Sequence, residues 1–296
     1  MLKVQRAKPN TPLHNIASWM IPIGLYDHLT VRRLPNDTAS TADIHFNHDS
    51  PRQETVDWPL DRDLAVRAHR ACEKHLGRSL PVAITLSKRI PTGGGLGGGS
   101  SDAAGMLVAL NQLFDTPITP DALHDIACTL GGDVPFALAA LTRCASAIVT
   151  GSGNIVTPVS APRCGHLVLL IPPFGCPTAS VFAALDAAQG GCDTLNTKAI
   201  RALTQIAAAP TPNPNLWTND LTDAACTLEP RLNAMRSAAA LLHHPNLFMT
   251  GSGSVCFVPC TDHPHALQTV RTVRSSSSPA FKNVAAIAVR YGGLIA

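Results

Sequence analysis

The sequence predicts an α+β protein with two domains. Strand-like and helix-like segments follow one another in a mixed order, which is typical of this class. A chain of 296 residues is long for one hydrophobic core and suits two. Turn-forming residues at 160–165 precede a new apolar strand, so we expect one domain over 1–162 and another over 163–296.

Periodicity and helix-capping residues predict the elements of the first half. Apolar residues at helical spacing favour a helix over 64–76. Thr119 is a good N-cap before Pro120 in the first helical position, so a second helix should run to Leu130. The other expected elements are strands at 25–32, 41–46 and 82–87, a helix over 103–114, and a hairpin of 145–150 with 155–158.

The second half is also mixed, with a proline-rich connection at 210–214. The expected elements are a strand at 166–171, helices beginning at Thr178 and near Asn196, one long helix over 221–242, two strands on either side of a glycine turn at 250–254, a helix after Asp262, and a strand over 284–289.

A dense glycine run lies between the strand at 82–87 and the helix over 103–114. Six glycines fall within Gly93–Gly99, and Ser100, Ser101 and Asp102 follow them. Glycine adopts positive φ, so successive amides can turn toward one anion, and the N-terminus of the following helix favours negative charge. The run therefore predicts phosphate binding, with the three polar residues as helix caps whose hydroxyls could also reach a phosphate or a metal.

Other interpretations of the run are weaker. A Walker A loop requires a lysine after its last glycine, and here Ser100 follows. The dinucleotide pattern G-x-G-x-x-G is met by Gly93, Gly95 and Gly98, as it would be by any dense glycine run, and no clear strand ending in an acidic residue follows at the usual distance. A flexible linker would not lie between a strand and a helix.

The glycine run and four later segments resemble the GHMP kinases, a family of ATP-dependent kinases of small alcohols. The run P-x-G-G-G-L-G-G-G-S-S-x-A-A is similar to the family's phosphate-binding motif. The other segments are G-G-D-V-P-F at 131–136, P-P-x-x-x-x-T-x-x-V-F at 172–182, N-D-L at 219–221 and M-T-G-S-G-S at 249–254. Three glycines on each side of a leucine are most similar to members that phosphorylate an alcohol carrying cytidine diphosphate.

The resemblance implies a fold, a reaction and site residues. The amino-terminal domain would be like domain 2 of ribosomal protein S5, and the carboxy-terminal domain ferredoxin-like. Asp133 would be the base for the substrate hydroxyl, and Lys8 would lie beside the transferring phosphate of ATP. The residues implied to bind ATP are Pro91, Gly93, Gly94, Gly95, Leu96, Gly97, Gly98, Gly99, Ser100 and Ser101, and those implied to bind the second substrate are Asn10, His14, Thr178, Phe182, Gly251 and Ser252.

Mg²⁺ is expected with ATP, because the charge of the phosphates must be offset. Ser101 and Asp102 are the nearest candidates to touch it, although Asp102 could serve only as a helix cap. Some site residues also have ordinary structural interpretations: Asp133 could form an Asx turn, the glycines around Ser252 a hairpin turn, and Lys8 could be a solvated terminal lysine.

The amino terminus departs from the family pattern. A-K-x-N fits 7–10 and a histidine-to-methionine segment fits 14–20, but only three residues lie between them, more than a dozen fewer than in the family. Pro9 and Pro12 remove two backbone donors from a first strand. Leu13 stands where family members carry the tyrosine that stacks on the base.

This departure leaves three functions open. They are a kinase for the cytidine diphosphate alcohol, a kinase of the same family for another alcohol, and a nucleotide-binding protein without transferase activity. Stacking on a nucleobase would depend on Phe182 alone.

Composition argues against several other classes. The net charge is +3 and no basic block occurs, so nucleic-acid binding is not expected. The longest apolar runs are strand-sized and end in proline, so no membrane contact or export signal is expected. We expect a cytoplasmic protein, monomeric or weakly dimeric, whose partner is a small-molecule substrate.

Cysteine and histidine spacing argues against disulfides and metal sites. Nine scattered cysteines without a C-x-x-C pair predict reduced, mostly buried thiols. The pairs His243–His244 and His263–His265 lack a cysteine or carboxylate at ligand spacing, which favours surface histidines.

Overall fold

The chain folds into two compact units that alternate along the sequence. The computed structural model describes residues 1–6, 14–114, 118–242 and 246–292. Unit 1 combines Met1–Gly24, Thr92–Leu96 and Cys144–Ala296, and unit 2 combines Leu25–Pro91 with Gly97–Arg143. The division by contacts thus falls inside the glycine run. A domain boundary at 162 stays a prediction.

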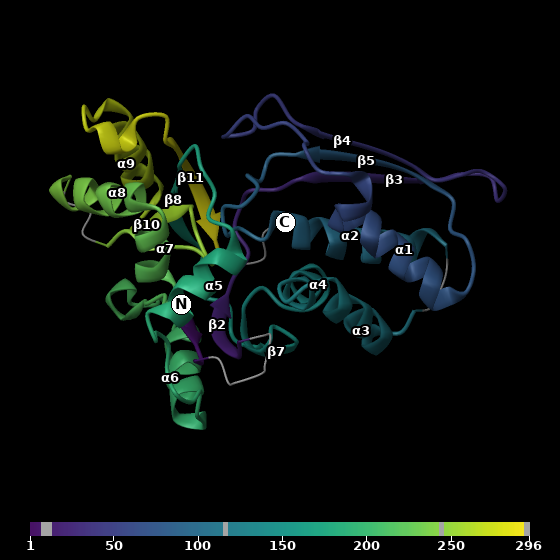
Figure 1. The fold of residues 1–296 in the computed structure, drawn as a ribbon, viewed down its shortest axis with the longest axis horizontal. Helices are drawn as coiled ribbons and strands as arrows, with labels where there is room; N and C mark the ends of the chain where they lie inside the picture. Colours follow the sequence, from purple (N-terminus) through teal and green to yellow (C-terminus); the bar gives the residue numbers. More distant parts are fainter. Residues whose placement is uncertain (7–13, 115–117, 243–245, 293–296) are drawn as a thin grey trace. The chain divides into compact units, whose positions relative to one another are not determined.

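Unit 2 is built in layers (Figure 1). A three-stranded sheet lies over α1 and α2, and α3 and α4 pack on the far side of those helices. The strands have the order β3-β5-β4, with β3 antiparallel and β4 parallel to β5. The elements are β3 (His28–Arg33), β4 (Thr41–Phe46), β5 (Val82–Lys88), α1 (Leu64–Leu76), α2 (Gly98–Leu113), α3 (Pro120–Leu130), α4 (Val134–Thr142) and the short 3₁₀ helix η1 (Leu60–Arg62).

Alternate residues of β5 form the core of unit 2 with α2. Val82, Ile84 and Leu86 are buried in one cluster with Met106 and Leu110. Successive side chains of a strand point to opposite faces, so every second residue of β5 meets the helix. The glycine run therefore leaves a buried strand and enters a buried helix, which fixes both of its ends.

Helices α1 and α3 begin and end where the sequence predicts. The Asp63 carboxylate accepts hydrogen bonds from the amides of Ala65 and Val66, and Gly77 ends α1 in the left-handed conformation at φ 64°. The Thr119 hydroxyl accepts a hydrogen bond from the amide of Ala122 at the start of α3. Both predictions are confirmed. Capping residues set these helix ends, and such residues can be recognised in the sequence.

Unit 1 contains two antiparallel sheets, with strand orders β1-β2-β6-β7 and β11-β8-β10-β9. The strands are β1 (Leu2–Val4), β2 (Ile16–Met20), β6 (Ala147–Gly151), β7 (Ile155–Pro158), β8 (Gly165–Ile171), β9 (Phe248–Met249), β10 (Cys256–Cys260) and β11 (Ala285–Tyr291). The helices are α5 (Thr178–Ala187), α6 (Thr197–Ala207), α7 (Thr222–Leu228), α8 (Pro230–Leu241), α9 (His263–Ser275), and the 3₁₀ helices η2 (Pro214–Leu216) and η3 (Pro279–Phe281).

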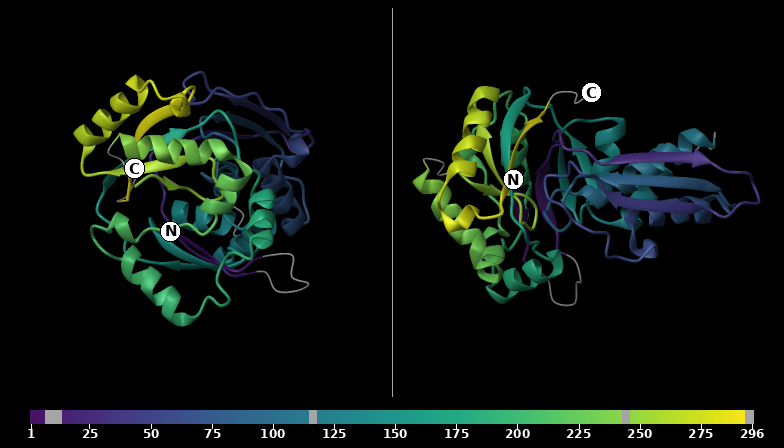
Figure 2. Two further views of the ribbon diagram at one scale, coloured as in Figure 1. Left: turned by 60° about the vertical axis from the view of Figure 1, so that its left-hand side comes forward. Right: turned by 90° about the horizontal axis from the view of Figure 1, so that it is seen from above.

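Helices α8 and α9 lie on one face of the β11-β8-β10-β9 sheet (Figure 2). Val168 and Leu170 of β8 are buried in the same cluster as Met235 of α8 and Val270 of α9. The hairpin of β6 and β7 and the strands flanking the glycine turn form as predicted.

The predicted helix over 221–242 is wrong in one respect, because it is two helices. α7 ends at Leu228 and α8 begins at Pro230. Proline has no amide hydrogen and disfavours helical backbone in the residue before it, and Glu229 has φ −130° and ψ 84°. The Glu229 carboxylate then accepts from the Arg231 amide and starts the second helix.

Two helix starts in unit 2 differ from expectation. α2 begins at Gly98, before Ser100, so the polar residues lie inside the helix and do not cap it. α4 directly follows Asp133 and was not expected, since Gly131 and Gly132 indicated only a tight bend.

All nine cysteines are free, but only Cys72, Cys176 and Cys256 are buried, so the expectation of mostly buried thiols is wrong.

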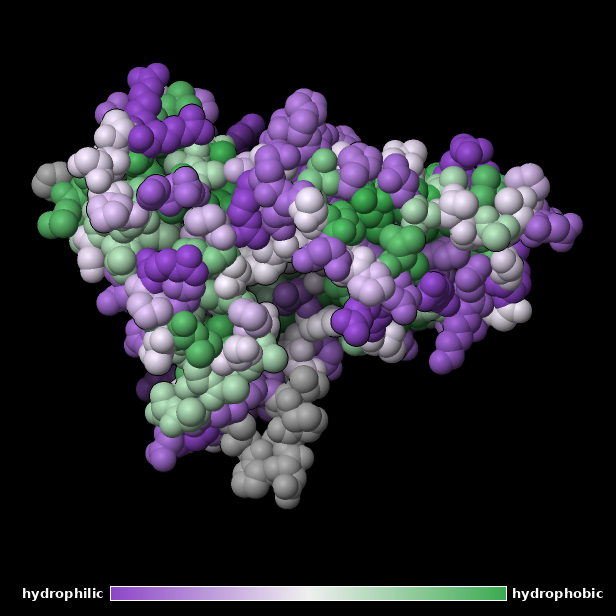
Figure 3. Space-filling model, turned by 45° about the horizontal axis from the view of Figure 1, so that its top comes forward, coloured by the Kyte–Doolittle hydropathy of each residue, from purple (hydrophilic) through white to green (hydrophobic). Residues whose placement is uncertain are grey.

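Hydrophilic side chains cover much of the face in Figure 3, and apolar residues form smaller groups among them. Among the described residues, no helix has both the length and the apolar character needed to cross a membrane.

Candidate active site

The N-terminus of α2 presents unpaired amides. Gly97 precedes the helix in the left-handed conformation at φ 69°, and no side chain caps the helix. The amides of Gly98, Gly99 and Ser100 lie in the first turn, where the helix offers no acceptor. The Ser101 amide bonds to the Gly97 carbonyl at 2.9 Å. Such a helix end attracts an anion through its free N–H groups and its dipole.

The first part of the run is held by backbone contacts within unit 1. The amide of Cys176 donates to the Gly93 carbonyl (3.2 Å), and the amide of Val255 to the Gly94 carbonyl (3.1 Å). The Thr250 hydroxyl donates to the Gly95 carbonyl at 2.9 Å. Pro91 is buried and Leu96 is partly buried.

Gly95 is required by both conformation and space. Its φ is 73°, and a Cβ there would overlap the carbonyl oxygen of Thr250. We expect Gly95→Ala to lower the free energy of unfolding by about 2–4 kcal/mol, because strain and a backbone clash add together. Gly77→Ala is the matched control, since Gly77 has φ 64° but open space around the Cβ position. Urea unfolding of both variants measures the difference, and equal losses would contradict the predicted clash.

The glycine turn at 250–254 joins β9 to the antiparallel strand β10, so the hairpin interpretation holds. The Asn219 side-chain amide donates to the carbonyls of Met249 (2.9 Å) and Gly251 (2.8 Å). The Ser254 hydroxyl donates to the carbonyl of Phe174. These bonds fix the turn that lies against the glycine run.

One face of α5 carries three polar or aromatic residues of unit 1 at helical spacing. They are Thr178, Phe182 and Asp186. The Thr178 and Ser252 hydroxyls are hydrogen-bonded at 2.9 Å. His14 Nε2 lies 2.8 Å from Asp186 Oδ1, and the His14 ring centroid lies 4.8 Å from that of Phe182. The structure therefore brings together four of the predicted substrate residues and adds Asp186, which the i, i+4, i+8 spacing could have indicated.

Asp133 stands at the N-terminus of α4, which packs against α2. Its side chain does not cap the helix, and no described residue forms a hydrogen bond or ion pair with its carboxylate. Asp133 is accessible to solvent, but protein atoms packed around its carboxyl displace part of its hydration. This desolvation raises the pKa of the carboxyl. A ligand can reach such a carboxylate, and protein atoms around it limit its hydration. The Asx-turn interpretation is not borne out.

Two predicted residues, Lys8 and Asn10, lie outside the described residues. Among the described residues, no group of three or more histidine, cysteine or acidic side chains could hold a metal ion.

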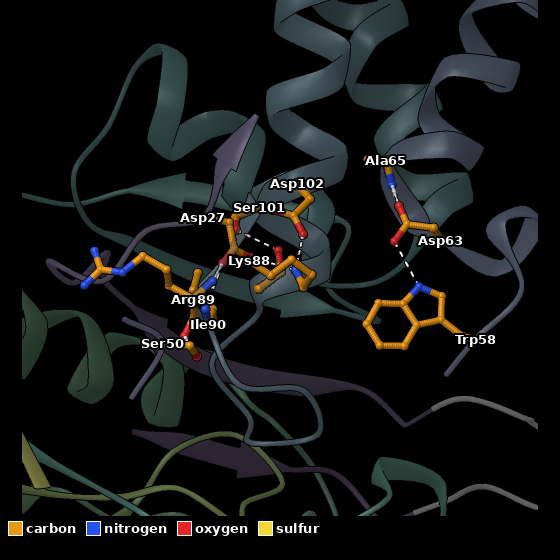
Figure 4. A network of polar contacts seen from close by, with 11 residues as sticks. Asp27, Ser50, Trp58, Asp63, Ala65, Lys88, Arg89, Ile90, Ser101 and Asp102 are labelled. Carbon is orange, nitrogen blue, oxygen red and sulfur yellow. Dashed lines mark hydrogen bonds and ion pairs between the residues drawn. The ribbon is translucent and has the colours of Figure 1, made fainter. Parts of the chain in front are cut away.

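Sequence reasoning missed a buried ionic cluster in unit 2 (Figure 4). Lys88 Nζ lies 2.7 Å from Asp27 Oδ2 and 2.5 Å from Asp102 Oδ2. All three side chains are at most 5% exposed. The available signal was a lysine at the end of an apolar strand, with an aspartate just beyond the glycine run.

The cluster alters the protonation of its members. Burial raises the pKa of Asp102 to about 7. The positive charge of Lys88 lowers this pKa in part, and the negative charge of Asp27 raises it further. Burial lowers the pKa of Lys88, but the two aspartates outweigh it and the pKa is raised. With all three groups charged the cluster carries one net negative charge, and with Asp102 protonated it is neutral.

Sequence comparisons place the chain among kinases. Residues 63–140 match the model of the GHMP kinases N terminal domain. The chain is 34% identical over 281 residues to a protein of Mycolicibacterium gilvum named 4-diphosphocytidyl-2-C-methyl-D-erythritol kinase, covering 90% of this chain and 83% of that one. A protein of the same name from Aromatoleum aromaticum is 33% identical, covering 91% and 88%.

Solved structures agree with these matches. A crystal structure of 4-(cytidine 5'-diphospho)-2C-methyl-D-erythritol kinase aligns with TM-score 0.72 and 30% identity over 99% of this chain and 95% of that one. Homoserine kinase from Cytophaga hutchinsonii aligns with TM-score 0.64 at 15% identity over 97% and 93%, which supports the fold alone. The expected α+β two-domain architecture is confirmed.

Proposed function

Because this chain belongs to the GHMP kinase family of ATP-dependent small-molecule kinases, we propose that it phosphorylates the 2-hydroxyl of 4-diphosphocytidyl-2-C-methyl-D-erythritol. The product would serve isoprenoid precursor biosynthesis by the non-mevalonate route. The observation that carries the substrate assignment is the 34% identity, over 90% of the chain, to a relative of that name.

The N-terminus of α2 is suited to the phosphates of ATP. Gly97 has no side chain to fill the position before the helix, and the free amides of Gly98, Gly99 and Ser100 offer donors. Mg²⁺ would offset phosphate charge when bound. Since the described residues contain no metal cluster, we propose that phosphate oxygens and water supply most of its ligands, with Ser101 as the nearest protein group.

We assign the proton-accepting role to Asp133. In phosphoryl transfer the protein mainly positions the reactants and stabilises charge, and an aspartate accepts the proton of the attacking hydroxyl. The absence of a capping bond leaves this carboxylate available, and its raised pKa makes it a better base than an ordinary aspartate. Lys8 remains our proposal for the cation beside the transferring phosphate.

His14 and Phe182 are proposed to bind the cytosine. When the Asp186 carboxylate accepts the Nε2 proton of His14, Nδ1 is left as an acceptor. A cytosine presents an exocyclic amine, which is a donor that matches such an acceptor. Thr178, Gly251, Ser252 and Asn10 stay proposed contacts to the rest of the substrate.

The role of Asp186 gives a testable difference between the two substrates. We expect Asp186→Asn to raise KM for the cytidine compound about tenfold, because the imidazole loses the partner that fixes its orientation and tautomer. KM for ATP should stay unchanged. Asp193→Asn is the control, since Asp193 is an exposed partner of Arg6 in the same unit. Steady-state kinetics with each substrate varied in turn measures both constants, and an equal rise in both would contradict the assignment.

The proposed reaction is tested by ADP release. The purified protein with ATP and Mg²⁺ should release ADP when 4-diphosphocytidyl-2-C-methyl-D-erythritol is added, and not when homoserine or mevalonate replaces it. ADP release with another alcohol alone would indicate a shifted substrate. ATP binding without turnover on any of them would indicate a nucleotide-binding protein that is not a transferase.

A further inference from the structure

The buried cluster of Lys88, Asp27 and Asp102 spans the two ends of the glycine run. Lys88 is the last residue of β5, and Asp102 lies in the first turns of α2, 14 positions later. The bond between Nζ and Oδ2 therefore closes the run across its base at 2.5 Å. The glycine segment is a loop with its two ends joined by an ion pair.

Asp27 fixes the entry of the same loop from a third element. It lies just before β3, 61 positions from Lys88. One carboxylate oxygen accepts from Lys88, and the other accepts from the amides of Arg89 (2.5 Å) and Ile90 (2.8 Å). The backbone that leaves β5 toward Pro91 is thus held by a side chain.

This arrangement is costly for fold stability alone. Removing three charged groups from water carries a large desolvation penalty, and apolar residues of similar volume often replace buried ion pairs without loss of stability. The bonds of the cluster hold the end of β5, the backbone amides at the entry of the loop, and the helix that follows the loop (Figure 4). A role in placing the loop accounts for both facts.

We propose that Lys88, Asp27 and Asp102 are positioning residues that hold the glycine loop and the N-terminus of α2 in the conformation that binds nucleotide phosphates. The inference rests on the proposed function and adds to it residues that contact neither phosphate nor substrate. Their effect is on nucleotide affinity.

Asp102→Ala is the direct test, because Lys88 keeps its pairing with Asp27 and no charge is left alone. We expect the dissociation constant for a fluorescent ATP analogue with Mg²⁺ to rise about tenfold, with the circular dichroism spectrum retained. The control is Glu73→Gln on α1, whose carboxylate accepts from the Leu80 amide at 2.8 Å and lies away from the loop. It should lower the melting temperature and leave the affinity within about twofold.

Asp102→Asn tests the same proposal without disturbing packing. The amide oxygen can still accept the hydrogen bond from Lys88 Nζ, so the loop stays closed across its base. This variant should bind the ATP analogue within about threefold of the wild type, and more tightly than Asp102→Ala does.

The outcomes separate this proposal from the proposed function. If the wild type binds the analogue but Asp102→Ala binds equally well, or Asp102→Asn binds as weakly as Asp102→Ala, the positioning role is overturned and the kinase assignment stands. If the wild type binds but does not phosphorylate the cytidine compound, only the substrate assignment fails. If the wild type does not bind the ATP analogue, both fail.

Discussion

Asp133→Asn is expected to lower kcat by about a thousandfold or more while the dissociation constant for ATP changes by less than about threefold. The amide cannot accept the proton of the substrate hydroxyl. Stability should hold, because the Asp133 side chain does not cap α4. Single-turnover rates and nucleotide binding, measured on the same preparation, separate the chemical step from affinity.

The control for this variant is Asp121→Asn, in the first turn of the neighbouring helix α3. It changes the same charge at an exposed position and should leave turnover within about twofold of the wild type. Wild-type kcat should also fall on the acid side of the profile, because a base must be ionised to act, and the raised pKa of Asp133 moves this limb above the usual aspartate range. Unchanged turnover in Asp133→Asn would remove it from the mechanism.

Lys88→Met is expected to lower the free energy of unfolding by about 3–5 kcal/mol at pH 8, because it leaves two buried carboxylates without a cation. Lys3→Met is the control. Lys3 also pairs with an aspartate, Asp220 at 2.8 Å, but is 39% exposed, so its loss should cost about 0–1 kcal/mol. Urea unfolding compares the two.

The loss in Lys88→Met should shrink as pH falls. In the wild type the pKa of Asp102 is raised from 3.8 in the unfolded chain to about 7, so only the unfolded chain releases this proton between those values. Its contribution to stability is therefore greatest below pH 3.8 and decreases as pH rises toward 7. Without Lys88 the folded pKa rises further, so the deficit should be larger at pH 8 than at pH 6. A deficit independent of pH would contradict a buried charge cluster.

The elements that sequence predicted best are those ended by side chains nearby in the chain. Asp63, Gly77 and Thr119 form hydrogen bonds with backbone groups no more than four residues away in the chain. The helices α1 and α3 could therefore be predicted from the sequence. Pro230 was an equally local signal that the run over 221–242 must break, and it was overlooked. By contrast, α2 begins on glycines, and no capping side chain marks its start.

The same distinction between local and distant contacts applies to the candidate active site. The glycine run and the motifs around Phe182 and Ser252 are local patterns. The partners that give them geometry are distant in sequence: Asp186 lies 172 positions from His14, and Lys88 lies 61 from Asp27. Which distant residues pair depends on how the strands and helices pack, and a single sequence carries no direct record of that.

The most direct test of the account is to identify the product. Incubation of the wild type with ATP, Mg²⁺ and 4-diphosphocytidyl-2-C-methyl-D-erythritol, followed by mass spectrometry and phosphorus NMR, should yield ADP and a substrate that has gained one phosphomonoester at its 2-hydroxyl. An unchanged cytidine compound, or a phosphate at another hydroxyl, would contradict it.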